Sequence, residues 1–579
     1  MTVYAYKYGC LPPLDWREDA ADCLYRQNRL WNRLVEIERE NRDKWRSLMA
    51  EDPAVADLEA KIADAQARID AVKEARKAAR IEKRRVNAAP AADAALSDLV
   101  AERKALAALA KAARQAAKAD MKPKLDALAD ERYQAVTAAR QEAAAGGLWW
   151  GHYNAVLASY ETARVRAMKE GADLKFHSFD GQGRFTNQIQ GGATLDDLRA
   201  HRGPAWIDPA PAGQYRAGVV LLRITLTTND QRERNMLTLP MVMHRPLPDG
   251  ARIKQVVVTR RKVGTRWRFS AVFTLDDPAP PAENGAVRAC GVNHGFRQVA
   301  GGLRVAMRVD SRGRESDVLL PQTWIDRMNH VSDLQSRLDE RLNEVHAAIR
   351  AWWRADDAQI EAERAALPDA VRERAIRIAA APKIGLGKLA AFALGWREAW
   401  EAQHGERFDE RPRAGLLADA EAWRRWDKRR REEMDNLRDK LLAQRREIYR
   451  TWAADTARDH AVVAVTEMDL REIARLESRD EEPTQLGAKP RSNRQLAAPS
   501  ELVGALKVAC QRHGARFLLV KGAAGACHAC GAAVSPGADL IASCPHCGSV
   551  WDQDVNAARN ACRMAAGDGR ERDCVEPVS

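Results

Sequence analysis

Four cysteines near the end of the sequence have the spacing of a metal site. They form two Cys-x-x-Cys pairs separated by thirteen residues: Cys527, Cys530, Cys544 and Cys547. Each pair aims two sulfurs at one point, so together they can close a tetrahedral site, for which zinc is the usual metal. Gly531 and Gly548 follow the pairs and suit the tight turns of such knuckles. The pattern predicts a structural zinc ribbon, with His528 and His546 as exposed neighbours rather than ligands.

Disulfides and a redox-active pair are the alternative interpretations of these cysteines. The N-terminal sequence has no basic region followed by an apolar one, so secretion is not expected, and disulfides are rare in chains that stay inside the cell. The remaining cysteines show no pairing pattern and are expected to be reduced thiols. They are Cys10, Cys23, Cys290, Cys510, Cys562 and Cys574.

Acidic and amide side chains stand at the ends of three further segments. A short apolar strand precedes Asn293, and a buried-type strand, VVAVT, ends before Glu467, with Asp469 two residues beyond. The third segment puts Asp552 and Asp554 at the start of a helix. Acids at the ends of adjacent strands and on a facing helix can converge on divalent metal ions, as in nucleases that hold two Mg2+ about 4 Å apart. We therefore expect a nuclease-like arrangement here.

The first part of the chain is expected to be mainly helical. Residues 3–10 alternate as an exposed or edge strand would, and a helix follows from about 15 to 49. Residues 53–120 have the spacing of a helical hairpin that turns near 87–90. Its heptad seam is predicted at Val55, Leu58, Ile62, Ala65, Ile69 and Val72, and at Leu96, Leu99, Leu106 and Leu109 on the return arm.

A basic run near the hairpin turn leaves two roles open. It comprises Lys73, Arg76, Lys77, Arg80, Lys83, Arg84 and Arg85. These residues can form the solvated outer face of a coiled coil, or they can contact a nucleic-acid backbone.

Residues further along predict a mostly antiparallel β domain. Short runs rich in branched residues and bounded by turn signals occur at 217–226, 236–243, 252–259 and 266–275. The connection between the last two is basic, and it places Arg260, Arg261 and Lys262 on or near a hairpin tip. A solubilising tip and a phosphate contact are both open interpretations.

A long helical stretch covers about 322 to 456. It contains many tryptophans, which at helical spacing are more often core residues than base-stacking platforms, among them Trp352, Trp353, Trp396, Trp400, Trp423, Trp426 and Trp452. It also holds six basic residues within eight positions: Arg424, Arg425, Lys428, Arg429, Arg430 and Arg431. On a helix these surround much of the circumference, so some should face a partner.

Length and charge limit the class of protein. The chain has 579 residues and a formal charge of +12, so several domains and a polyanionic partner are expected, although much of the surplus can be ordinary surface. It has no run of about 18 apolar residues, so no transmembrane span is expected.

The order of these motifs resembles the split RuvC domain of TnpB-like proteins and type V CRISPR effectors, and most closely the compact type V-M subtype. The specific similarity covers residues 287–563, including GVNHG, VVAVTEMDL, the zinc ribbon and DQDVNAARNA. The resemblance implies a bilobed, multidomain α+β protein with a helical recognition lobe that carries a coiled-coil hairpin, an antiparallel β wedge domain, and a split RuvC domain, RNase H-like α/β, with an inserted zinc ribbon. The implied boundaries are a wedge strand at 1–14, the helical lobe at 15–172, the β wedge domain at 173–286, RuvC part I at 287–321, a helical insertion or bridge region at 322–456, RuvC part II at 457–524, the target nucleic-acid-binding zinc ribbon at 525–550, and RuvC part III with the tail at 551–579.

Family roles carry over position by position onto a degenerate site. The second-motif glutamate falls on Glu467 and the third-motif aspartate on Asp554, but Asn293 stands where the first-motif aspartate is expected. A carboxamide offers one neutral oxygen where a carboxylate would bridge metals, so Mg2+ binding by Glu467 and Asp554 should be weakened. His294 could supply a nitrogen, which suits Zn2+ or Mn2+ better than Mg2+. The alternative is that Asn293 is a turn residue and that Asp469 or Asp552 restores activity.

The resemblance implies a CRISPR RNA-guided double-stranded DNA-binding effector that silences its targets by occupancy, blocking transcription or replication, rather than by cleavage. Its partners would be a CRISPR RNA and target DNA with a short T-rich flanking motif, and it would act in antiviral defence as a monomeric ribonucleoprotein in the bacterial cytoplasm. The alternatives are an active RNA-guided endonuclease of the same fold and a transposon-associated zinc-ribbon DNA-binding protein. Relatives of this subtype mature their own guide RNA, but no His/Lys constellation places that activity here. Candidate nucleic-acid contacts are Arg184, Gln188, Gln190, Arg260, Arg261, Lys262, Arg266, Arg268 and the 424–431 cluster; Phe185 could instead pack in the β domain.

Overall fold

The computed structural model describes residues 2–16, 18–83, 91–228, 233–264, 266–277, 288–410, 414–468, 488–535 and 539–567. The described chain divides into two units. The first is built mainly from residues up to 262 together with 267–277, and the second from 263–266 and 288–567.

The first unit contains a seven-stranded sheet with the order β2-β6-β7-β1-β5-β4-β3. Its strands are β1 (Thr2–Cys10), β2 (Gly183–Ala193), β3 (Ala205–Pro209), β4 (Val219–Thr228), β5 (Arg234–Val242), β6 (Arg252–Val263) and β7 (Arg266–Asp277). The prediction of an edge strand at the N-terminus is wrong. β1 lies inside the sheet, antiparallel to both β7 and β5, and its Tyr8 is fully buried. Alternating polar and apolar residues indicate a strand whose two faces have different surroundings. An interior strand can have this pattern as well as an edge strand.

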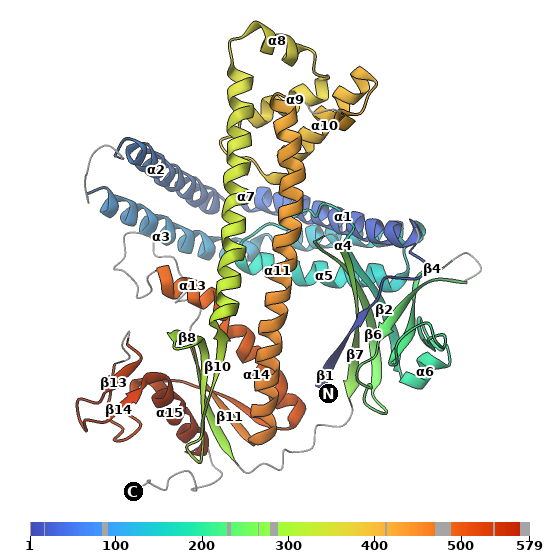
Figure 1. The fold of residues 1–579 in the computed structure, drawn as a ribbon. Coiled ribbons are helices and arrows are strands. Elements are labelled where there is room, and N and C mark those ends of the chain that lie inside the picture. Colours follow the sequence, from blue (N-terminus) through green and yellow to red (C-terminus); the bar gives the residue numbers. More distant parts are fainter. Residues whose placement is uncertain are drawn as a thin grey trace. The chain divides into compact units, whose positions relative to one another are not determined.

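Helices make up the rest of the first unit. They are α1 (Glu18–Met49), α2 (Pro53–Lys83), α3 (Ala91–Asp120), α4 (Lys122–Ala145), α5 (Trp150–Glu170) and the short α6 (Leu195–Arg199). Figure 1 shows α2 and α3 side by side as the predicted hairpin. The turn at 87–90 and the side chains of the basic run lie outside the described residues.

The hairpin seam is confirmed on the outgoing arm, where Val55, Ala65 and Ile69 are buried. On the return arm it departs from the prediction, because Leu109 is 57% exposed and Ala110 is fully buried. Alternating steps of three and four residues from Leu96 lead to Ala110 and not to Leu109. The heptad register, and not the hydrophobicity of the residue, therefore decides which position is buried.

The second unit is built on a five-stranded sheet with the order β10-β9-β8-β11-β12. Its strands are β8 (Ala289–Val299), β9 (Gly302–Asp310), β10 (Glu315–Pro321), β11 (Val462–Thr466) and β12 (Arg516–Val520). β10, β9 and β8 form an antiparallel meander, and β11 pairs in parallel with β8 on one side and β12 on the other.

Both faces of this sheet are covered by helices. Because side chains alternate along a strand, Cys290 and Val292 face a core shared with α7 (Gln322–Arg354), α11 (Leu416–Asp459) and α14 (Pro499–His513). Ala289 and Gly291 face the other way, toward α15 (Gln553–Gly567). A further helix beside the sheet is α13 (Ala488–Ala497).

Two long helices, α7 and α11, lie side by side and lead from the sheet to a small distal bundle (Figure 1). The bundle contains α8 (Ala358–Ala365), α9 (Asp369–Ala380), α10 (Leu386–His404) and the turn η1 (Phe408–Glu410). Trp352, Trp396 and Trp423 are buried in its core, as helical spacing predicts, whereas Trp426 is 38% exposed. No helix in the described part of the chain is long and apolar enough to cross a membrane.

Candidate functional site

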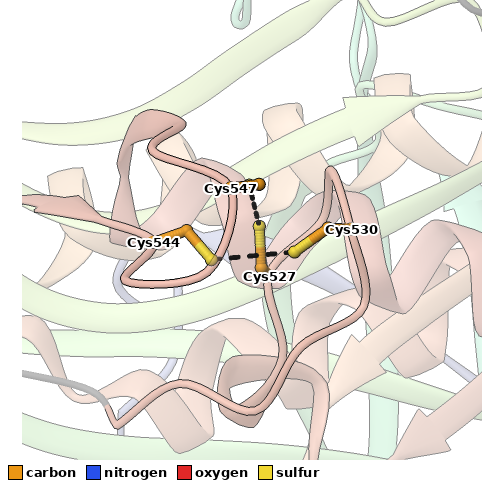
Figure 2. A group of neighbouring side chains, drawn as sticks. All are labelled: Cys527, Cys530, Cys544 and Cys547. Atoms are coloured by element: carbon orange, nitrogen blue, oxygen red, sulfur yellow. Dashed lines mark hydrogen bonds between the residues drawn. The ribbon is translucent and has the colours of Figure 1, made fainter.

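The four predicted cysteines converge on one point (Figure 2). They come from two loops beside η2 (Ala523–Gly525) and the small hairpin of β13 (Ile541–Ser543) and β14 (Val550–Asp552). The sulfurs of Cys527 and Cys547 are 3.8 Å apart and those of Cys530 and Cys544 are 3.7 Å apart, and all four lie within 4.8 Å of one another. Zn–S bonds of about 2.3 Å in a tetrahedron place sulfurs about 3.8 Å apart, so the donor set fits Zn2+.

The two knuckles share one backbone geometry. Gly531 N–H donates to the Cys527 carbonyl at 2.8 Å, and Gly548 N–H donates to the Cys544 carbonyl at 3.0 Å. Both glycines have positive φ, +76° and +72°, which accounts for glycine after each pair.

The two knuckle histidines differ, although both were expected to be exposed. His546 is exposed, but His528 is half-buried and joins the ribbon to α15. Its backbone N–H donates to the Asn556 side-chain oxygen at 2.7 Å, and its Nε2 lies 2.8 Å from a guanidinium nitrogen of Arg559. Burial lowers the pKa of His528. The side chain therefore has a positioning role within the protein.

The first and third motif residues meet beside the sheet. In the parallel register Val292 pairs with Val465, so the next residues, Asn293 and Thr466, are neighbours where β11 ends, and β8 continues past Asn293 to Val299, beyond the end that the sequence predicts for this strand. Thr466 Oγ1 donates to Asn293 Oδ1 at 2.9 Å, and Asn293 Nδ2 donates to Asp554 Oδ1 at 3.0 Å. The amide therefore presents its N–H groups, not its oxygen, to the aspartate.

Two arginines surround the same aspartate. Arg297 Nε lies 3.4 Å from Asp554 Oδ1, and an Nη of Arg304 lies 3.5 Å from Asp554 Oδ2 and 2.6 Å from Asp552 Oδ2. Asp554 is only 5% exposed. Burial raises its pKa, with Asp552 adding to the rise, while Arg297 and Arg304 oppose it. Sequence reasoning missed both arginines, since β8 and β9 bring them to Asp554 across some 250 residues.

Glu467 does not join this group in the structure. It is exposed, and it forms an ion pair with Lys521 at 3.6 Å. Among the described residues, the four cysteines are the only group of three or more His, Cys, Asp or Glu side chains whose ligand atoms converge. Asp469 lies outside the described residues. The side chains around Asp554 do not fit Mg2+, because two guanidinium groups hold the positions that a cation would need.

The His294 side chain is not exposed to receive a metal ion either. It is 3% exposed, its Nδ1 lies 3.4 Å from Thr466 Oγ1, and burial lowers its pKa to about 4.

The predicted nucleic-acid contacts of the first unit differ in their surroundings. Arg260 is not a free phosphate contact: its guanidinium lies between the rings of Trp16 and Trp267, 3.9 and 3.7 Å from their centroids. Exposed candidates are Arg184, Gln190, Arg261, Lys262, Arg266 and Arg268, with Gln188 half-buried. Phe185 is fully buried in the β-domain core, as the packing interpretation expected.

Within the 424–431 cluster, most charges are already balanced. Arg424 and Arg425 both bond to the buried Glu421, and Arg431 makes two hydrogen bonds, of 2.8 and 3.1 Å, to the buried Asp427. Arg430 pairs with Glu433 at 2.7 Å. Lys428 and Arg429 are exposed.

Comparison with known proteins adds independent evidence. The family model "Cas12f1-like, TNB domain" matches residues 500–561, which include the four cysteines. A curated relative from Pelobacter propionicus, named "CRISPR-associated DNA-binding protein Cas12m", is 35% identical over 97% of this chain and 88% of its own length. The chain belongs to the Cas12m family. A Cas12m relative from Thermanaerosceptrum fracticalcis is 28% identical over 76% of this chain and 73% of its own length.

These relatives confirm the resemblance to type V effectors. Among solved structures, "Cryo-EM structure of the Cas12f1-sgRNA-target DNA complex" aligns with 97% of this chain and 98% of that chain at 10% identity and a TM-score of 0.37. A TM-score this low does not establish a shared fold, so the Cas12m assignment rests on the sequence relatives.

Proposed function

We propose that this Cas12m protein is a CRISPR RNA-guided, double-stranded DNA-binding effector that silences targets by occupancy and does not cleave them. The relatives' printed names describe DNA-binding proteins. In guide-directed effectors of a sister class, base pairing reads the sequence while the protein reads a short flanking motif and the heteroduplex backbone. The T-rich motif, the wedge role of the first sheet and the bacterial cytoplasm as its location belong to the same proposal.

The second unit would be the RuvC-like, RNase H-like domain. The strand order β10-β9-β8-β11-β12, with an antiparallel meander followed by two parallel strands, supports this assignment. So does the position of Asn293 beside Thr466 and Asp554, where β8 passes the carboxyl end of β11. The ribbon after β12 would carry a structural Zn2+.

The observation that carries the absence of cleavage is the surroundings of Asp554. Its carboxylate faces one amide donor and two arginines, within 3.0 to 3.5 Å. Two-metal nucleases need anionic oxygens free to bridge two cations. Here the protein supplies the balancing cations itself, so Asp554 serves as an internal counter-ion. Persistent occupancy of the opened DNA would then block transcription or replication.

The proposal is tested by purifying the protein with its RNA. We expect RNA of defined repeat sequence to copurify, and the complex to retain a matching duplex in a gel-shift assay. A scrambled guide of the same length is the matched control. Equal binding with both guides, or the absence of bound RNA, would refute a guide-directed role and favour a guide-independent zinc-ribbon DNA-binding protein.

A further inference from the structure

Asn556 belongs to α15 and stands two residues after Asp554, in the turn that the sequence assigns to the nuclease motif. Its side chain bonds to the loop of the first knuckle, beside Cys527. Oδ1 accepts from the His528 N–H at 2.7 Å, and Nδ2 donates to the Ala526 carbonyl at 2.8 Å. Ala526 and His528 directly precede and follow Cys527, so one amide group holds the backbone on both sides of a predicted zinc ligand.

This contact is buried and is shared by a second amide. Asn556 is 2% exposed, and Asn560, one turn further along α15, is 7% exposed. Asn560 Nδ2 donates to the Ala526 carbonyl at 2.7 Å and to the Ala523 carbonyl at 2.8 Å. Buried polar groups need such partners, because water does not reach them to take the place of a lost bond. α15 therefore fixes the path of the chain from Ala523 into the first knuckle.

The His528 ring fixes which way the Asn556 amide is turned. Its Nε2 lies 2.8 Å from a guanidinium nitrogen of Arg559, and an arginine can only donate, so Nε2 accepts. The hydrogen of the neutral ring is then on Nδ1, which donates to Asn556 Oδ1 at 3.0 Å. The amide oxygen thus accepts two hydrogen bonds, and the amide nitrogen faces the Ala526 carbonyl.

The two knuckles differ in what holds them. In the second, the Cys544 N–H donates to the Ser549 carbonyl at 2.8 Å, within the knuckle's own loop. The first has the equivalent bond, from the Cys527 N–H to the Ala532 carbonyl at 2.9 Å, and the bonds from α15 are added to it. The orientation of Cys527 therefore depends on a helix outside the ribbon.

We propose that Asn556 is a positioning residue of the metal site, which orients Cys527 for a zinc ion, and that Asn560 supports it. Hydrogen bonds that orient metal ligands contribute to binding, since their loss typically lowers metal affinity about 10–100-fold. The inference rests on the zinc site of the proposed function and goes beyond it, because it gives a role in metal binding to the asparagine of the Asp-x-Asn-Ala-Ala motif. The turn that carries Asp554 thus also serves the ribbon.

The test is the zinc affinity of the full chain with Asn556→Ala, measured by competition with a chromophoric chelator. We expect the affinity to fall at least about tenfold. The Co2+-loaded variant should also show a shifted visible absorption spectrum, because that spectrum reports the angles between the four thiolates. Asn556→Asp is a second variant, which keeps an acceptor for His528 and loses the donor to Ala526, and its zinc affinity should fall as well.

Asn187→Ala is the matched control. Asn187 is fully buried in the first unit, where its amide accepts from the Thr225 N–H at 3.0 Å and donates to the Thr225 carbonyl at 3.4 Å. The control removes an amide with the same kind of paired bonds, so a general loss of stability is matched while the ribbon is untouched. Its zinc affinity and Co2+ spectrum should equal those of the unaltered chain.

A zinc affinity of Asn556→Ala equal to that of Asn187→Ala would overturn the inference, and if the alanine variant does not fold, Asn556→Asp decides in the same way. The unaltered chain is measured alongside. If it binds no zinc, the zinc site itself fails; if it binds zinc and the Asn556 variant binds it equally well, only the role of Asn556 falls.

Discussion

Asp554 is the residue on which the interpretation of the second unit depends, because one carboxylate can either bind a metal or balance an arginine. Its position in Asp-x-Asn-Ala-Ala was predictable from the motif, as was the amide at position 293. The arginines were not, since Arg297 and Arg304 follow no motif and reach Asp554 only because α15 packs against β8 and β9. Local patterns identify residue types; long-range pairing decides their charge environment.

His152 gives a prediction at the same scale. It is fully buried, its Nδ1 accepts the Thr186 N–H at 3.1 Å, and burial lowers its pKa from 6.5 to about 4. Folding lowers the pKa of His152, so the protein is stabilised when the ring is neutral. This contribution to the free energy of unfolding is present above about pH 6.5 and is lost as the pH falls toward 4. The free energy of unfolding should fall by about 2 kcal/mol from pH 7 to pH 5 through this group.

Urea unfolding at the two pH values measures this effect. His152→Gln should be less stable at pH 7 and should lose less stability on acidification, whereas His330→Gln, an exposed histidine of α7, should leave the wild-type slope. An unchanged slope in His152→Gln would refute the assignment.

At the scale of elements, periodicity predicted the helices α1 to α3 and the strands β4 to β7, and it failed where tertiary context decides. β1 has an ambiguous pattern and is interior because its neighbours in the sheet come from residues 234–277. Gly291 shows the same limit. It stands in a strand for a reason that the sequence does not disclose: a Cβ there would lie 1.9 Å from the Ala558 carbonyl oxygen of α15.

Gly291→Ala should therefore displace α15 and the Asp554 that it carries. The second close atom is also backbone, Cys562 N at 2.4 Å, so no side-chain rotation relieves the clash. Overpacking of this kind typically costs about 1–3 kcal/mol or more. Gly504→Ala, in a helix with nothing within 4 Å, is the matched control and should be neutral or stabilising by up to about 1 kcal/mol. Thermal unfolding compares the two, and equal midpoints would contradict the packing argument.

The zinc ribbon gives a second prediction at this scale. We expect the purified chain to contain about one zinc per molecule, since four thiolates define one tetrahedral site. A strong chelator should remove it and raise hydrogen exchange in the knuckles, and then at the start of α15, which His528 and Asn556 join to the ribbon. Cys544→Ser should behave like the chelated protein, and Cys510→Ser, a buried thiol outside the ribbon, should retain the metal. A full complement of zinc in Cys544→Ser would refute the site.

At the scale of the whole molecule, the formal charge of +12 is not spread evenly over free cations. In α11 the basic cluster that the sequence singled out is largely paired with Glu421, Asp427 and Glu433. A count of the basic residues misses this pairing, because acids three or four residues away on a helix neutralise the charges of the cluster.

Lys428 and Arg429 are the cluster members best placed to contact nucleic acid. Changing both to Gln should weaken DNA binding regardless of sequence, and should reduce the slope of log affinity against log salt by about 2, since each phosphate that a cation neutralises adds about 0.9 to that slope. Arg424→Gln with Arg431→Gln is the contrasting pair. It should lower stability, because Asp427 is left buried without Arg431, while Glu421 loses one of its three arginines and keeps Arg425 and Arg397. A salt slope unchanged by the first pair would exclude α11 from the interface.

Whether the guide-loaded protein cleaves a target that it fully occupies decides between silencing by occupancy and silencing by cleavage. The guide-loaded protein is bound to a supercoiled plasmid carrying the target, occupancy is verified by footprinting, and Mg2+ or Mn2+ is added. We expect the plasmid to stay supercoiled while occupied, and Asn293→Asp to gain at most weak nicking, because Arg297 and Arg304 still surround Asp554. Efficient linearisation of the plasmid by the unaltered protein would contradict silencing by occupancy.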